Sequence, residues 1–240
     1  MKSLSTILLV AAALTSVHFA QAQTIDELQA KYVDALGGKD KLTALKTVYQ
    51  ETSTEVMGMT LPTRTWIIFG AAMRSEVEVQ GQKIITYISK TKGWVVNPMN
   101  GSSDAQPMPD DALKVTATRL NAGGEFFNYK ENGYTASYVG KEDVEGKSCH
   151  KIKLSKDGSE ITIYLDPESY YLARSIYKAN MMGQEVEQVF NYSDFKKSPE
   201  GFIFPYKIST NNPQAGDIVN NVTKIDVNKP IDAKEMEKEN

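Results

Sequence analysis

The spacing of apolar residues first follows a helical period and then a strand period. In residues 25–36 apolar side chains recur at steps of three and four, which predicts a short amphipathic helix. Thr24 suits the N-cap of this helix, and Gly37 and Gly38 are typical of a helix end. Residues 39–46 predict one or two further helical turns.

Most of the remaining chain shows the two-residue alternation of strands. The clearest case is residues 73–80, where Met73, Val77 and Val79 alternate with charged or polar residues. Glycine and proline turns separate the runs. About a dozen short strands without βαβ helices predict one antiparallel sheet, strongly curved or closed as a barrel. The predicted strands are 48–57, 60–69, 73–80, 83–89, 93–97, 136–142, 147–155, 160–165, 171–178, 184–192, 202–210 and 218–227.

A second helix, predicted at residues 109–120, interrupts the strands in mid-chain. Pro109 suits its first turn, and proline- and glycine-rich segments flank it. Because a lid needs hinges, we expect this helix to cover the concave face of the sheet as a lid or plug. A further short element at 125–127 carries two large aromatic residues. The apolar stripe of the helix is Leu113, Ala117 and Leu120.

Large and flexible apolar side chains are the candidates for the surface beneath this lid. Methionine and aromatic side chains suit an adaptable apolar pocket, because they repack around ligands of varied shape. The same residues could equally fill an ordinary interface between sheet and helix, and both readings stay open. The candidate ligand-binding residues are Trp66, Ile68, Met73, Val77, Trp94, Leu113, Ala117, Leu120, Phe126, Phe127, Met181 and Met182.

The N-terminus has the pattern of a secretory signal peptide. Lys2 supplies a positive charge, residues 7–14 are apolar, and small residues precede a predicted cleavage after Ala22. The alternative, a membrane anchor, is disfavoured because a bilayer takes roughly 20 apolar residues. We therefore expect residues 1–22 to be removed and residues 23–240 to form a single domain in the periplasm.

Charge and motifs point away from several function classes. The formal net charge of −3 gives no electrostatic reason to expect nucleic acid as a partner. GxSxG, HExxH, P-loop and GxGxxG motifs are absent, and His150 is the only histidine after the signal, so we predict no catalytic residues, metal site or cofactor. Cys149, the only cysteine, is expected to be structural and half-buried, facing away from His150.

Carboxylates are plentiful, but nothing selects one pair for hydrolysis. Asp166, just before Pro167, predicts turn chemistry in which its side chain caps the backbone. A hydrolase with an unrecognised carboxylate site remains an alternative.

Several short segments, in this order, resemble secreted Bacteroidetes-type members of the outer-membrane lipoprotein-sorting protein group, the periplasmic carriers of the LolA, LolB and LppX kind. The resemblance implies an incomplete antiparallel β-barrel, with N-terminal and mid-chain helices closing an apolar cavity that receives acyl chains. The matching segments are 32–42 with 46–48, 164–168 with 172–174, 191–195 with 201–205, and 227–232.

These patterns together predict a mainly β, LolA-like protein of the periplasm. On the resemblance, it would be a monomeric carrier or binder of lipid or lipoprotein acyl chains in outer-membrane lipoprotein sorting. Envelope proteins would then donate or accept the ligand. The alternative is a non-enzymatic envelope sensor or scaffold that binds a protein partner on the concave sheet.

Overall fold

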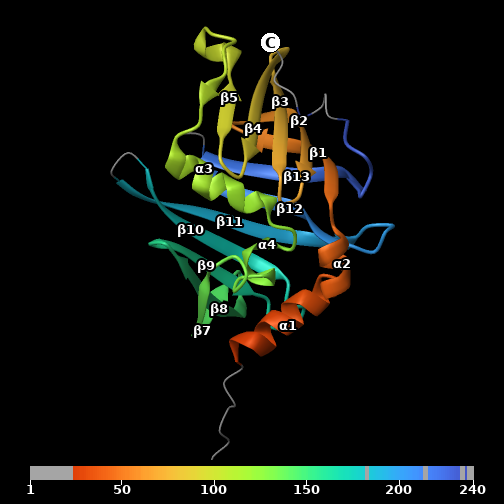
Figure 1. The fold of residues 1–240 in the computed structure, drawn as a ribbon, viewed down its shortest axis with the longest axis vertical. Coiled ribbons are helices and arrows are strands. Elements are labelled where there is room, and N and C mark those ends of the chain that lie inside the picture. The colour runs from red at the N-terminus through yellow and green to blue at the C-terminus, as the bar shows by residue number, and fades with distance from the viewer. Residues whose placement is uncertain (1–23, 182–183, 213–215, 233–235, 237–240) are drawn as a thin grey trace, which may run out of the picture.

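The computed structural model describes residues 24–181, 184–212, 216–232 and 236; the predicted signal peptide lies outside this part of the chain (Figure 1). The N-terminal helices are α1 (Ile25–Ala35) and α2 (Lys39–Ala44). Thr24 caps α1 as predicted: its Oγ1 accepts from the Glu27 N–H at 3.2 Å, and the Glu27 carboxylate accepts from the Thr24 N–H at 3.0 Å.

One sheet of thirteen strands contains every described strand, in the order β6-β5-β4-β3-β2-β1-β13-β12-β11-β10-β9-β8-β7. All neighbouring strands are antiparallel, and the two edge strands do not pair, so the predicted mainly β, curved and incompletely closed sheet is confirmed. The strands are β1 (Thr47–Val56), β2 (Met59–Ile68), β3 (Ala72–Val79), β4 (Gln82–Ser89), β5 (Gly93–Val96), β6 (Gln106–Pro107), β7 (Thr135–Val144), β8 (Lys147–Lys156), β9 (Ser159–Leu165), β10 (Leu172–Met181), β11 (Gln184–Lys197), β12 (Ile203–Asn212) and β13 (Gly216–Val227).

The mid-chain helices lie between β6 and β7. A 3-10 turn, η1 (Pro98–Asn100), precedes α3 (Asp110–Ala117); a second 3-10 turn, η2 (Thr118–Leu120), and α4 (Gly124–Phe127) follow. The helix predicted over 109–120 is therefore α-helical only to Ala117. In Figure 1, α3 lies across the sheet between β4 and β10, and both strands contact it.

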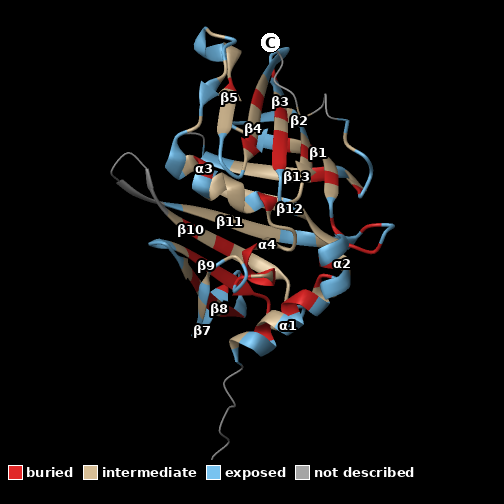
Figure 2. Ribbon diagram, in the orientation of Figure 1, coloured by how far each residue is buried: buried red, intermediate tan, exposed pale blue. Residues whose placement is uncertain are grey.

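The main apolar core lies at the end of the sheet formed by β7–β10, where α1 and α4 pack on the strands (Figure 2). A smaller cluster of Met73, Ile88, Leu113 and Leu120 lies beneath α3. The two clusters are separate, but Val115 of α3 packs against the main core, so the helix contacts both clusters. The buried members of the main core are Leu28, Tyr32, Val33, Leu36, Leu42, Phe126, Phe127, Tyr129, Ile152, Leu154, Ile161, Ile163, Leu165 and Tyr177.

Candidate functional site

Strand register divides the side chains of β1–β5 between two faces. Ile67, Met73 and Ile88 are successive register partners on β2, β3 and β4, and they pack with Leu113 and Leu120 of the α3–η2 segment. We call the face that carries these residues the inner face. Since side chains alternate along a strand, the residues adjacent to them in sequence lie on the opposite, outer face.

A row of polar side chains lies beside the apolar row on the inner face. Gln50, Thr65, Ser75 and Thr86 are register partners on β1–β4. The Thr65 and Ser75 hydroxyl oxygens are 3.2 Å apart, and Gln50 Nε2 donates to Thr52 Oγ1 at 2.9 Å. The inner face is therefore amphipathic, with an apolar strip beneath α3 and a strip of hydroxyl and amide groups next to it.

The helix that crosses this face has few attachments to it. Leu113 is the only buried residue of α3, and no side chain caps the N-terminus of the helix. The hydroxyls of Thr116 and Thr118 donate to carbonyls of the same segment, at 2.7 and 2.6 Å. A hollow of about 180 Å³ separates the helix from the β4–β5 turn beside Leu113 and Ala117. One buried leucine, Leu113, and the partly buried Val115, which packs against the main core, thus supply the apolar contacts of α3, and we interpret the helix as a separable cover.

A buried carboxyl group joins the segment after α3 to the sheet. Glu125, in α4, is 7 % exposed, and its Oε2 accepts a hydrogen bond from the Tyr177 hydroxyl of β10 at 3.3 Å. Burial raises the pKa of Glu125, and hydrogen bonds that include those from Thr118 and Tyr177 oppose the shift only in part. Burial therefore favours the protonated form of the carboxyl at the point where the cover meets β10.

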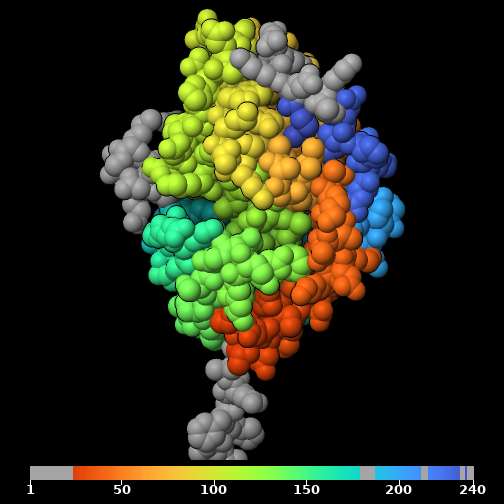
Figure 3. Space-filling model, viewed as in Figure 1, coloured from red at the N-terminus to blue at the C-terminus, as the bar shows by residue number. Residues whose placement is uncertain are grey.

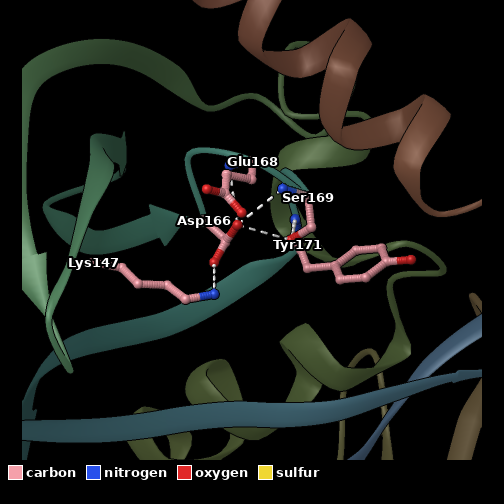
Figure 4. A network of polar contacts seen from close by, with 5 residues as sticks. All are labelled: Lys147, Asp166, Glu168, Ser169 and Tyr171. Atoms are coloured by element: carbon pink, nitrogen blue, oxygen red, sulfur yellow. Dashed lines mark hydrogen bonds and ion pairs between the residues drawn. The ribbon is translucent and has the colours of Figure 1, made fainter.

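The turn chemistry predicted for Asp166 is confirmed (Figure 4). Its Oδ1 accepts from the backbone N–H groups of Glu168 and Ser169 at 3.0 and 2.9 Å, and its Oδ2 lies 2.6 Å from Lys147 Nζ. Burial alone would raise the pKa of Asp166, but the Lys147 ammonium and the backbone donors lower it to about 2. The Asp166 carboxylate thus stabilises the β9–β10 turn.

Cys149 and His150 point to opposite faces of β8, as expected. Cys149 packs with Val144 and Tyr164, whereas the His150 ring stacks on Tyr170 at 5.9 Å. The prediction that the cysteine is half-buried is wrong: its side chain is fully buried in a cluster with Val144 and Tyr164, against which Ala173 and Ile176 pack.

The described residues hold neither a metal-binding cluster nor a membrane-spanning helix. They contain no group of three or more histidine, cysteine, aspartate or glutamate side chains placed to hold a metal ion. No helix among them has the length and apolar character needed to cross a membrane.

The register corrects the expectation that all candidate ligand-binding residues share one surface. Trp66, Ile68 and Trp94 lie on the outer face, whereas Met73 and Val77 lie on the inner face. The physical reason is the unbroken apolar run at the end of β2, which hides the two-residue alternation that assigns side chains to faces.

The other candidates fall into three groups. Leu113 and Leu120 pack on Met73, and Ala117 borders the hollow beside α3. Phe126 and Phe127 are buried in the main core under α1, which contributes Gln29 Nε2 as a donor to the Phe127 carbonyl at 2.6 Å. Met182 lies outside the described residues, and the side chain of Met181 is likewise not described. A binding role for the inner-face residues stays a prediction.

Comparisons with known proteins agree with this architecture. The family described as "Predicted periplasmic protein (DUF2092)" matches residues 17–215. No curated protein matches the chain. Among solved structures, a LolA superfamily protein from Nitrosomonas europaea has a TM-score of 0.59 at 9 % identity, covering 90 % of this chain and 99 % of its own.

Two further structures of the same size are similar. A DUF1329 family protein from Desulfovibrio piger has a TM-score of 0.59 at 15 % identity, over 89 % of this chain and 97 % of its own. A putative outer membrane lipoprotein-sorting protein domain from Vibrio parahaemolyticus has a TM-score of 0.57 at 11 % identity, over 90 % and 98 %. At these identities the likeness shows the fold alone, and the Bacteroidetes-type assignment stays a prediction.

Proposed function

Since the chain belongs to the DUF2092 family of predicted periplasmic proteins and has a LolA-like fold, we propose that it binds a lipid through an acyl chain on the inner face, beneath α3. In this proposal the protein is a non-enzymatic binder or carrier in the periplasm. Its more specific role would be to pass a lipid or lipoprotein from one protein partner of the envelope to another.

The observation that carries this proposal is the position of α3. This helix crosses the inner face between β4 and β10, and Figure 3 shows the segment that contains it between β3–β5 (yellow) and the β9–β10 region (teal). Its apolar anchor, Leu113, sits on Met73 and Ile88 and not on the main core. Displacing the helix would expose an apolar strip and would remove the partly buried Val115 from the main core.

The amphipathic inner face suits a ligand with two unlike ends. An acyl chain that replaces α3 on Met73 and Ile88 keeps these buried side chains out of water and gains free energy by burying its own surface, at about 25 cal/mol for each Å². The neighbouring hydroxyls of Thr65 and Ser75 are hydrogen-bond partners for the ester or head-group oxygens next to that chain. This arrangement favours an amphiphile over a wholly apolar ligand.

The test compares two adjacent positions of β4 that face opposite sides. Thr86→Trp places a large ring on the inner face, whereas Tyr87→Trp makes a comparable change on the outer face. The mature chain and both variants are titrated with dansyl-undecanoic acid, a fluorescent acyl probe, and the folded state of each is checked by circular dichroism. We expect Thr86→Trp to weaken binding about tenfold and Tyr87→Trp to leave it unchanged.

A second pair of variants addresses the cover itself. Leu113→Glu puts a charge against the apolar strip, whereas Lys114→Glu changes a neighbouring exposed position of the same helix. Only the first is expected to alter uptake of the probe. If the parent protein binds no acyl probe and yields no lipid on extraction, the proposal fails. Co-purification of one stoichiometric protein without lipid would then favour the sensor or scaffold alternative.

A further inference from the structure

A second concave surface lies on the outer face, on the side of the sheet opposite α3. It is an open groove of about 690 Å³, within the size range of small-molecule sites. Strands β1–β4 form its floor, and residues 229–232, which follow β13, form one wall. In Figure 3 the C-terminal segment (blue) lies beside the orange β1–β2 region.

The carboxylates of this groove are already paired with cations. Glu76 accepts from Arg74 at 2.7 Å and lies 3.6 Å from Lys83. Glu51 lies 3.7 Å from Lys224 and also accepts from a tyrosine hydroxyl. Asp226 lies 3.2 Å from the same lysine, Lys224. Their charges are therefore largely satisfied within the protein.

Arg64 is the exception among the charged groups of the groove. Strand register places it between Glu51 and Glu76, but both carboxylates are engaged elsewhere. Within the described part of the chain, no hydrogen bond or ion pair reaches the exposed Arg64 side chain. A guanidinium without a partner presents a planar fork of donors that matches a carboxylate.

Aromatic rings lie next to this guanidinium. Trp66 is two residues from Arg64 on β2 and so shares its face, and the rings of Trp66 and Tyr49 are 5.3 Å apart. Trp66 is only 8 % exposed, so the partly exposed Tyr49 ring beside it offers most of the apolar surface to the flat side of a ligand ring. Carboxylates at the rim, such as Glu51 and Asp226, accept hydrogen bonds from hydroxyl groups.

The local charge balance limits the charge of the ligand. The lining of the groove holds four carboxylates and three cationic side chains, and Arg74 and Lys224 pair with Glu76 and Glu51 from beside it. The surrounding carboxylates would repel a dianionic phosphate, so the anion that suits the unpaired Arg64 carries a single charge. The carboxylates are Glu51, Glu76, Asp226 and Asp232, and the cations are Arg64, Arg74, Lys83, Lys224 and Lys229.

We propose that the outer groove is a binding site for a sugar acid, a hydroxylated ring with one carboxylate. The carboxylate binds Arg64, the ring lies against Trp66 and Tyr49, and the hydroxyls donate to the rim carboxylates. This site is separate from the acyl-chain surface, since β2 and β3 present the two to opposite faces.

The test follows the indole N–H signals of the full mature chain by NMR. The chain has two tryptophans, so Trp94→Phe assigns the signal of Trp66. The probes are glucuronate, glucose, which lacks the carboxylate, and cyclohexanecarboxylate, which lacks the hydroxyls. We expect glucuronate to shift the Trp66 signal and to bind at least tenfold more tightly than either partial probe.

Variants of the arginine complete the test. Arg64→Gln should weaken glucuronate binding about tenfold or more, and Arg64→Lys, which keeps the charge but not the fork, should be intermediate. Arg119→Gln, the same change at another exposed arginine, should have no effect.

Three results would overturn the proposal: no shift with glucuronate, equal binding of glucose, or equal binding by Arg64→Gln. A shift caused by a peptide of residues 233–240 but not by glucuronate would assign the groove to acidic peptides instead.

Discussion

Replacing Leu113 by alanine tests whether α3 opens independently of the rest of the sheet. Leu113 is 8 % exposed and packs on Met73, Ile88 and Leu120. Leucine-to-alanine changes in cores cost about 2–5 kcal/mol, and the hollow already beside Leu113 places this site near 2 kcal/mol. If α3 is a separable cover, the lost free energy destabilises only the closed position of the helix. The equilibrium constant for its opening would then rise about 30-fold.

Hydrogen exchange measured by mass spectrometry separates local from global opening. Amides of residues 110–120 should exchange about 30-fold faster in Leu113→Ala, while those of α1 and β8 keep their protection. Leu154→Ala serves as the contrasting control, because Leu154 is fully buried in the main core and its loss should weaken every element. Equal acceleration in α1 and α3 for Leu113→Ala would refute the idea of a separable cover.

Three further outcomes are expected from the buried polar groups. Asp166→Asn should cost about 1–2 kcal/mol at neutral pH, allowing for the exposed Lys147. The folded pKa of Asp166 is about 2, below the ordinary 3.8, so the difference in unfolding free energy between parent and variant should disappear as pH falls from 4 to 2. Urea unfolding measures this difference, and a constant value over that range would contradict the prediction. Glu125→Gln should gain stability over the parent as pH rises above 4.5, because the raised pKa makes ionisation of Glu125 costly; parallel thermal unfolding profiles would refute this. Cys149 should react with a thiol reagent only on unfolding, since it is fully buried and burial raises its pKa; rapid reaction of the folded protein would exclude that placement.

Much of the fold was readable from local pattern. The last strand, predicted at 218–227, is Gly216–Val227, and the predicted cap at Thr24 forms. Such features depend on alternation and on short-range hydrogen bonds, which the sequence carries directly. In contrast, η1 and the two-residue β6 fall in a proline-rich segment, where no periodic pattern marks them.

The candidate site was less predictable, because it depends on which face a residue occupies. The apolar run at Trp66 and Ile68 does not reveal the strand register, so these residues were placed with Met73 although they lie on the other face. The sequence predicts only a short element at 125–127, and nothing in it marks Glu125 as a buried residue that bonds the distant Tyr177. The first point depends on the register of the β2–β3 hairpin, which the apolar run leaves unmarked, and the second on a contact between residues 52 positions apart.

The order of strands has a consequence for how the protein is assembled. β1 pairs with β13, the last strand, along its whole length, and this pairing alone joins the meander β1–β6 to the meander β7–β13 within the sheet. Each meander consists of hairpins between neighbouring strands, which form from local contacts, whereas the β1–β13 seam has the greatest sequence separation in the fold. A chain emerging N-terminus first therefore leaves β1 as an unpaired edge until translation or translocation delivers β13. During that interval β1 is the strand most exposed to pairing with the wrong chain, and periplasmic chaperones that shield it would raise the yield of folded protein.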